Sequence, residues 1–295
     1  MKSSRSRRTT LVAYLFLTPA ILGLVFITVL PLLGVVGISL THWSGLVPPT
    51  YIGLDNYRDI FTVDPYFARS VVATLYFAVV AVIMGTLYAF FVALMLNQRI
   101  PGRGFFRSVF FLPYVVPSVG ASVVWGWMYE ANFGVFNYFL SLFGFDKVQW
   151  LGNDITATPS IIALTVWGLG NFIVIFLAGL QSVPTSYLEA VEIDGGRAWH
   201  KFRHVTLPLM SPIIFFNVLM SLVTNLQIFI PARTLTKGGP NNSTLYMVLL
   251  IFREGFERNN FGHAAAVSLI FFLFIGALTG LIFATSRKWL FFEGA

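Results

Sequence analysis

The chain alternates between long apolar stretches and short polar connections. Six stretches contain no Asp, Glu, Lys or Arg, and they cover residues 9–54, 70–98, 108–129, 155–188, 204–232 and 259–286. A helix needs about 20 apolar residues to cross the hydrocarbon core of a bilayer. Trimmed to their apolar parts, the stretches predict six transmembrane helices at 11–40, 71–96, 108–128, 159–181, 212–230 and 264–286.

Prolines mark several of the predicted helix boundaries. Thr158-Pro159 and Ser211-Pro212 each place a capping residue before a proline, a pattern typical of a helix start. Pro113 and Pro117 fall inside the third stretch, where we expect a kink. A further apolar piece, residues 245–252, is too short to span a bilayer, and we expect it at the surface.

The composition supports a membrane protein. Apolar residues make up 57% of the 295 residues and charged residues only 11%, with a mean hydropathy of +0.78. Soluble domains contain about 25% charged residues. The chain has no cysteine, which excludes disulfides, thiolate metal ligands and a cysteine nucleophile.

The distribution of charge predicts the orientation. With the N-terminus in the cytoplasm, the inside segments hold 12 Lys and Arg against four acidic residues, and the outside segments hold seven against eight. This is the positive-inside pattern, with both termini cytoplasmic. The cations are spread over four short segments, which does not favour nucleic-acid binding. The predicted organisation is a basic N-terminus at 1–10, a first helix at 11–40, an external loop at 41–70, a five-helix core at 71–286 and a cytoplasmic tail at 287–295.

The segment at 182–208 is too long and too apolar for a passive connection. Ser186 and Glu189 form an S-x-x-E pattern, which predicts a capped short helix. Asp194-Gly195-Gly196 predicts the end of this helix, and a second short helix follows, which Leu207-Pro208 would break. A helix–turn–helix with exposed apolar side chains is suited to docking in a groove of a partner.

This segment resembles the EAA loop of binding-protein-dependent ABC importer permeases. The matching positions are Glu189-Ala190, Gly195, and Val205 followed by Leu207-Pro208, with Val191 and Val205 where the family usually has Ala and often Ile. Other stretches are similar to the maltose-permease-like subgroup of the sugar permeases. They are Gly53–Tyr57, Gly102-Arg103 with Phe106-Arg107 and Phe111–Pro113, Gly238–Pro240 with Ser243-Thr244, and Gly262–Ala266.

The resemblance implies an all-α integral membrane protein with the type I ABC importer permease fold, in a prokaryotic cell membrane. It implies four kinds of companion: two ATPase subunits, a second and non-identical permease chain, an external solute-binding protein and the lipid bilayer. The 182–208 loop would couple ATP hydrolysis to the membrane helices through Glu189, Ala190, Val191, Asp194, Gly195, Val205, Leu207 and Pro208. The sequence contains no G-x-x-x-x-G-K-[ST] phosphate loop, so ATP would be bound by the partner subunits and this chain would hold no cofactor.

Neutral polar residues on two predicted spans are candidates for a translocation path. Asn217, Ser221 and Asn225 recur every four residues, with Thr224 adjacent and Gln227 near the end of the helix. Trp167 and Asn171 lie one turn apart on the preceding span. Amides and aromatic faces suit an uncharged sugar or sugar-like solute. The alternative is a structural role, in which these residues form hydrogen bonds between membrane helices.

Two other classes of protein remain as alternatives at this level. An ATP-independent secondary carrier or channel would need no ATPase partner, although such carriers commonly place acids or histidines at mid-membrane. An intramembrane enzyme would require a catalytic pair or a metal cluster in the spans. The four-residue spacing of His200 and His204 can suit a metal, but no third ligand accompanies them, so we predict neither a catalytic nor a metal site.

Overall fold

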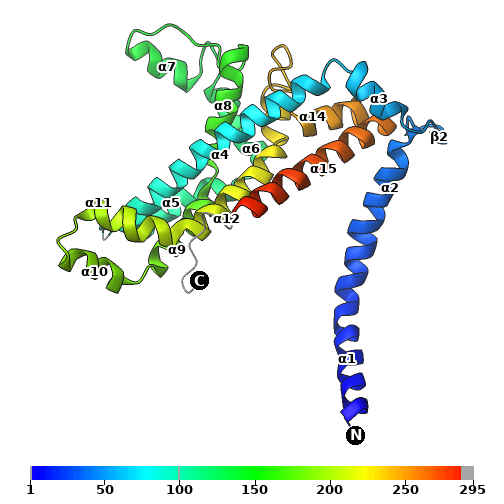
Figure 1. Cartoon of the computed structure of the whole chain (residues 1–295). Helices are drawn as coiled ribbons and strands as arrows, with labels where there is room; N and C mark the ends of the chain where they lie inside the picture. The colour runs from blue at the N-terminus through cyan, green and yellow to red at the C-terminus, as the bar shows by residue number, and fades with distance from the viewer. Residues whose placement is uncertain (1, 99, 287–295) are drawn as a thin grey trace. The chain divides into compact units, whose positions relative to one another are not determined.

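The computed structural model describes residues 2–98 and 100–286, with side chains from residue 12 onward (Figure 1). The expected cytoplasmic tail at 287–295 therefore lies outside the described residues. Four helices are long and apolar enough to cross a membrane, and there are six if each of two bent helix pairs counts as one span. The six predicted spans correspond to these helices. The described secondary structure is helical apart from one pair of two-residue strands.

The chain forms two units, of which the first contains residues up to Asp64 together with Ile251–Phe272. Its first span is a continuous helical run that consists of α1 (Lys2–Gly23), η1 (Leu24–Val29) and α2 (Leu30–Ser39). In the most apolar stretch of 18 residues within Val12–Ser39, no residue is buried. The strands β1 (Thr41–His42) and β2 (Thr50–Tyr51) pair antiparallel and lead into α3 (Asp55–Thr62).

The second part of this unit comes from the C-terminal region. It contains η3 (Arg253–Glu257) and the start of α15 (Phe261–Ser286). His263 at the start of α15 lies 3.2 Å from the carboxylate of Asp64 just after α3, and both side chains are largely buried. This contact joins the two separate stretches of chain that make up the unit.

The second unit contains Pro65–Leu250 and the chain from Leu273, and it holds the predicted functional residues. Its helices are α4 (Phe67–Asn97), α5 (Arg103–Val115), α6 (Ser118–Met128), α7 (Val135–Leu142), α8 (Asp154–Trp167), α9 (Gly170–Ser182), α10 (Thr185–Ile193), α11 (Ala198–Lys201), η2 (Phe202–Thr206), α12 (Leu207–Leu226), α13 (Ile230–Leu235) and most of α14 (Met247–Phe252). Helices α4, α9 and α12 pack on one another and form its centre. In this packing Phe90 of α4 meets Phe176 of α9 edge to face, with ring centroids 5.2 Å apart.

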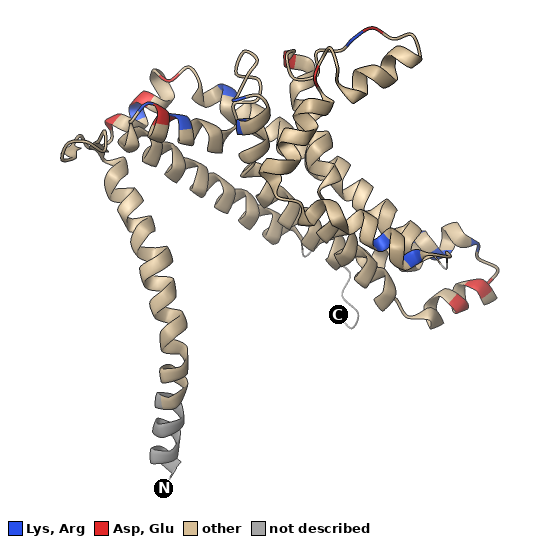
Figure 2. Ribbon diagram, turned by 180° about the vertical axis from the view of Figure 1, so that it is seen from behind, with Lys and Arg blue, Asp and Glu red and all other residues tan. Residues whose placement is uncertain are grey.

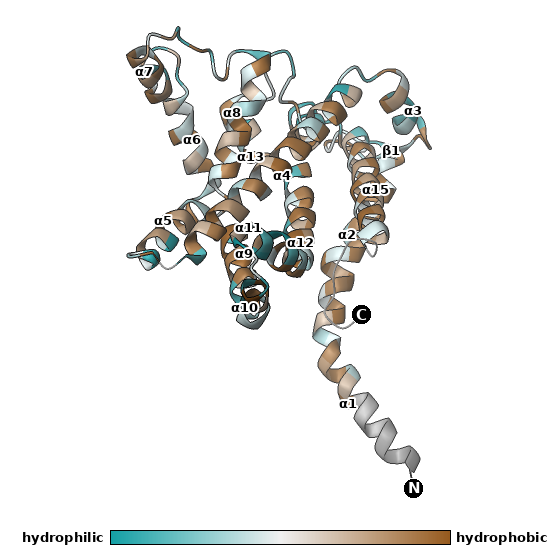
Figure 3. Cartoon of the chain, turned by 60° about the vertical axis from the view of Figure 1, so that its left-hand side comes forward, coloured by the Kyte–Doolittle hydropathy of each residue, from teal (hydrophilic) through white to brown (hydrophobic). Residues whose placement is uncertain are grey.

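The distribution of residue types agrees with a protein embedded in lipid. Figure 2 shows the charged residues mainly at helix ends and in loops, and Figure 3 shows that hydrophobic residues predominate along the long helices. Many large apolar side chains on the long apolar helices are exposed, including Phe16, Leu87 and Leu273. Such a surface is stable where hydrocarbon, not water, surrounds it.

Prolines bend the helices more than they begin them. The predicted kink at Pro113 and Pro117 is confirmed, and it is large: α5 and α6 meet at 99°. The predicted helix starts at Pro159 and Pro212 are wrong, because both prolines lie inside helices. Helix α8 begins earlier, where the side chain of Asn153 accepts a hydrogen bond from the backbone N–H of Ile155.

The short apolar piece at 245–252 is not at the surface as expected. Leu245, Tyr246 and Met247 are completely or almost completely buried in the second unit. The backbone N–H of Met247 donates to Thr74 Oγ1 at 2.9 Å, and the Tyr246 ring packs 4.9 Å from that of Phe77. A short apolar segment is buried here because α4 supplies both a hydrogen-bond acceptor and an aromatic surface.

Candidate coupling loop and translocation surface

The 182–208 segment forms a helical hairpin at one end of α9 and α12 (Figure 1). Helix α10 ends at Ile193, and Gly195 then adopts a left-handed conformation with φ +79°. The amide of Gly196 donates to the carbonyl of Val191 at 2.8 Å, which closes the turn. The predicted glycine turn is therefore confirmed, and it is a position that residues with a Cβ rarely adopt.

Two expected details of the hairpin are wrong. Ser186 does not cap α10, because the extended backbone of Pro184 already ends the preceding segment and the helix begins at Thr185. Pro208 does not break the second helix, since the chain is helical without interruption from Ala198 through η2 to Leu226. The proline ring follows the wider π-helical turn η2, and a π turn changes the hydrogen-bond register at that point.

An ion pair joins the two helices of the hairpin. Lys201 of α11 donates to the carboxylate of Glu192 in α10 at 2.5 Å. The hydrogen bond and the positive charge of Lys201 lower the pKa of Glu192 below its ordinary value. Because Glu192 is exposed, we expect this pair to contribute orientation more than stability.

The surface of the hairpin is exposed and mixed in character. Ile193 is 87% exposed and Trp199 is 62% exposed. Of the predicted coupling residues, Glu189, Ala190, Asp194, Gly195 and Leu207 are exposed, Val191 and Pro208 are half-buried, and Val205 is buried. The ring centroids of Trp199 and Phe202 are 5.5 Å apart, and those of Phe202 and Phe90 of α4 are 6.2 Å apart. The hairpin is thus attached to the membrane helices through aromatic packing.

Three of the predicted path residues line one cavity of 390 Å³. Trp167 and Asn171 come from the bend between α8 and α9, and Thr224 comes from α12. Tyr114 and Ser118, from the bent pair α5 and α6, also line it. The cavity therefore combines aromatic faces with an amide and hydroxyl groups.

The other polar residues of α12 lie elsewhere. Asn217, Ser221 and Asn225 are buried within the chain, and Gln227 is exposed at the end of the helix. Asn225 Nδ2 donates to the carbonyl and the hydroxyl of Ser221, at 2.8 and 3.0 Å. The amide of Asn217 is 1% exposed and has no hydrogen-bond partner among the described residues. The four-residue spacing correctly placed three residues on one face, and that face is turned into the unit.

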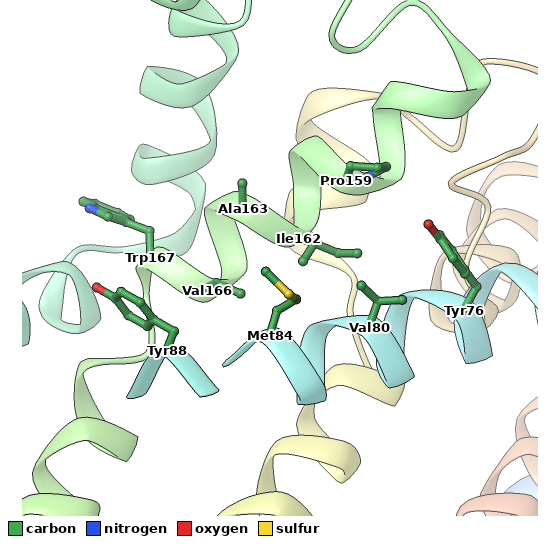
Figure 4. A pocket seen from close by; sticks show the side chains of 9 residues that line it. All are labelled: Tyr76, Val80, Met84, Tyr88, Pro159, Ile162, Ala163, Val166 and Trp167. Atoms are coloured by element: carbon green, nitrogen blue, oxygen red, sulfur yellow. The ribbon is translucent and has the colours of Figure 1, made fainter. Parts of the chain in front are cut away.

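A second cavity, of 480 Å³ and almost entirely apolar, lies between α4 and α8 (Figure 4). Tyr88 and Trp167 lie together at one end of it and Tyr76 at the other, with Met84 between them. Trp167 lines both this cavity and the 390 Å³ cavity. Tyr76 and Tyr88 were not among the predicted path residues, and their one signal in the sequence is a hydroxyl group within an otherwise apolar span.

An aromatic chain leads from Trp167 to the loop between α7 and α8. The ring centroids of Trp167 and Trp125 are 5.7 Å apart, those of Trp125 and Tyr129 5.6 Å, and those of Tyr129 and Trp150 5.9 Å. Buried Asn137 of α7 holds this loop, because its side chain accepts from Trp150 Nε1 and exchanges hydrogen bonds with the backbone of Val148. Asn137 was also missed, although a lone amide in the apolar run of α7 was a possible signal.

The described residues contain no group of three or more His, Cys, Asp or Glu side chains that could hold a metal ion. His200 and His204 stack with ring centroids 6.1 Å apart, and His204 Nδ1 contacts the carbonyl of His200.

The helices and cavities define a multi-pass membrane protein with an exposed helical hairpin. The chain belongs to the family of binding-protein-dependent transport system inner membrane components, whose model matches residues 85–290. It is therefore a permease subunit of an ABC transporter, not a catalytic subunit. This membership decides against the self-sufficient carrier, because the family works together with a binding protein.

Individual relatives match nearly the whole chain. A probable ABC transporter permease protein of Bacillus subtilis, YesP, is 35% identical and covers 99% of this chain and 96% of its own length. The trehalose/maltose transport system permease protein MalF of Thermococcus litoralis is 31% identical, with 95% of each chain covered. A bacterial alginate ABC transporter, solved in complex with an alginate pentasaccharide-bound periplasmic protein, has the same fold, with a TM-score of 0.86 at 21% identity and 98% of each chain covered.

Proposed function

We propose that this permease subunit imports a sugar, an oligosaccharide or a sugar-like solute by alternating access. A solute-binding protein delivers the substrate from outside, and two ATPase subunits drive the cycle from the cytoplasm. A second, non-identical permease chain completes the path. The similarity to the trehalose/maltose permease of Thermococcus litoralis supports the sugar class.

The cavity around Trp167, Asn171 and Thr224 is the observation that carries the substrate proposal. Sugars present hydroxyl groups at the edge of the ring and C–H groups on its faces, so they bind to amides and to aromatic rings together. Among the described residues, no acidic or basic side chain lines this cavity. Its lining therefore suits an uncharged substrate better than an amino acid or an inorganic ion.

The hairpin of α10 and α11 is the proposed coupling element. Its exposed face combines the carboxylates of Glu189 and Asp194 with the apolar side chains of Ile193 and Trp199. Such a surface fits a groove on another protein, with the apolar residues at the centre and the charges at the rim. Its aromatic attachment to α4 would transmit a movement of the ATPase subunits to the membrane helices.

Uptake measurements test the substrate class. Membrane vesicles that contain the complete transporter are supplied with ATP and with radiolabelled trehalose, maltose or histidine. We expect ATP-dependent uptake of at least one of the two sugars and none of histidine. Uptake of histidine alone would exclude the sugar assignment.

A further inference from the structure

Arg107, in the second turn of α5, has two guanidinium nitrogens without an acceptor. Its Nε and Nη2 atoms are shielded from solvent, and neither has a hydrogen-bond partner among the residues that the structure describes. Arginine stays protonated throughout the biological pH range, so burial cannot be relieved by loss of a proton. Arg107 is half-buried, and shielded N–H groups of a cation are costly when no acceptor meets them. The site therefore suits an anion.

The protein elements around Arg107 cannot supply that anion. The sequence has no acidic residue between Asp64 and Glu130, which covers α4, α5 and α6, and none between Asp154 and Glu189, which covers α9. Arg103 adds a second cation one turn earlier on the same helix. No carboxylate of these helices is available to Arg107, and an anion from another molecule would complete the site.

Arg107 lines a cavity of 210 Å³ whose wall is formed mainly by α9. The wall is apolar and includes Leu96, Phe111, Ile173, Val174 and Leu177. Gln181, at the end of α9, is the other side chain with hydrogen-bonding groups in this lining. The cavity thus has a cation and an amide beside an apolar surface.

The position of Arg107 against α9 is fixed by backbone contact. A Cβ on Gly170 would lie 2.9 Å from the carbonyl oxygens of Phe110 and Phe111, so α5 and α9 approach closely only because this residue is glycine. Arg107 lies one turn before Phe111 on α5. Its side chain is therefore held beside α9.

We propose that this cavity binds an anionic phospholipid, whose phosphate accepts hydrogen bonds from Arg107 and whose acyl chain lies along the apolar wall of α9. Arg107 directly precedes the uncharged run 108–129. A residue at the end of a membrane span lies at the level of the phospholipid headgroups. A carboxylate from a companion protein would satisfy the charge and leave the apolar wall empty, whereas a lipid satisfies both. The proposal does not depend on the transport substrate. With the proposed orientation Arg107 lies at the cytoplasmic side, so the lipid would belong to the inner leaflet.

Native mass spectrometry of the full chain tests the proposal. The protein is purified in detergent, incubated with phosphatidylcholine vesicles that contain phosphatidylglycerol, and examined for retained lipid. We expect wild-type protein to retain phosphatidylglycerol. Arg107→Gln should lower retention about tenfold, the factor for one charge-assisted hydrogen bond.

A second variant addresses the apolar wall. Ala178 lines the cavity and is exposed, so Ala178→Phe should be tolerated by the fold while it fills the space and leaves Arg107 intact. We expect it to lower retention as well, and we expect Arg58→Gln, which changes an exposed arginine on α3, to have no effect. Wild-type retention by either cavity variant would overturn the proposal. The proposal would also be overturned if companion subunits displaced the lipid and a carboxylate of one of them then cross-linked to Arg107. No outcome depends on transport, so failure here leaves the proposed function untouched.

Discussion

Gly195 shows how one residue can separate folding from coupling. Its left-handed backbone at φ +79° reverses the chain between α10 and α11. Apart from its chain neighbours, no described residue has an atom within 4 Å of the position that a Cβ would occupy. A side chain there meets open space and costs only the backbone strain, about 1 kcal/mol. The added side chain would instead project into any groove in which the hairpin docks.

The first prediction concerns Gly195→Asp. We expect this variant to insert and assemble normally but to lose ATP-dependent uptake while ATP hydrolysis continues. Gly144→Asp is a matched control, because Gly144 has φ +76° and equally open surroundings, in the loop after α7. Uptake and ATPase activity in reconstituted vesicles measure the outcome. Equal uptake by the two variants would remove the coupling role of Gly195.

The second prediction separates the two asparagines that the sequence proposes for the path. Asn171 lines the 390 Å³ cavity, whereas Asn225 is buried and bonded to Ser221 within its own helix. We therefore expect Asn171→Leu to reduce uptake with normal assembly, by about tenfold if one substrate hydrogen bond is lost. Asn225→Leu should reduce the yield of assembled protein as well. If Asn225→Leu instead lowers uptake alone, the buried stripe becomes part of the path in another state of the transport cycle.

At the scale of single elements, sequence predicted the spans well and their ends less well. The uncharged runs identified each membrane helix because the bilayer requires about 20 apolar residues with no charge. The prolines were harder to interpret. Pro159 and Pro212 were assigned to helix starts, yet both lie inside helices, where only the surrounding chain can compensate the lost hydrogen bonds.

The same limit applies to the candidate site. Periodicity placed Asn217, Ser221 and Asn225 on one face, which their shared burial agrees with. It could not say whether that face is turned toward a path or into the unit, because the answer depends on which helix packs against it. The clustering of Trp167, Asn171 and Thr224 likewise depends on the 50° bend between α8 and α9, which no local pattern specified.

The ion pair between α10 and α11 predicts a dependence on pH. Lys201 lowers the pKa of Glu192, so the pair contributes its full stabilisation above the unfolded-state pKa, about 4.3, and loses it as the pH falls through the lower folded-state value. We expect hydrogen exchange at the Gly196 amide, normalised for intrinsic rate, to accelerate in that acidic range. Lys201→Gln should exchange faster at neutral pH and lose this acid dependence. An unchanged profile in the variant would show that the pair does not hold the turn.

Asn137 gives a prediction for the loop that carries α7. Its amide makes hydrogen bonds to Ala131, Val148 and Trp150, and no other side chain replaces them in Asn137→Ala. Each buried group left unpaired costs about 1–3 kcal/mol. We expect a clearly lower midpoint of thermal unfolding in detergent. Asn132→Ala, which removes an exposed amide, should leave the midpoint close to wild type.

At the scale of the whole molecule, the charge distribution is the link between sequence and mechanism. The hairpin can meet an ATPase only if it lies on the cytoplasmic side, and the solute-binding protein can act only on the opposite side. If each bent pair counts as one span, the described residues contain six spans, and an even number places both termini on one side. One span, the bent pair α8 and α9, lies between α7 and α10, so this topology places α7 and α10 on opposite faces of the membrane.

The absence of cysteine makes this orientation directly testable. A thiol-reactive label does not react with the wild-type chain, because the sequence contains no cysteine. Each single Ser→Cys variant therefore reports on one position. Ser186 on α10 and Ser141 on α7 are both exposed. In spheroplasts treated with a membrane-impermeant maleimide, we expect Ser141→Cys to be labelled at once and Ser186→Cys only after lysis. Labelling of Ser186→Cys in intact spheroplasts would place the hairpin outside, where no ATP-hydrolysing subunit could reach it, and would refute the coupling role while leaving the fold and the family membership unaffected.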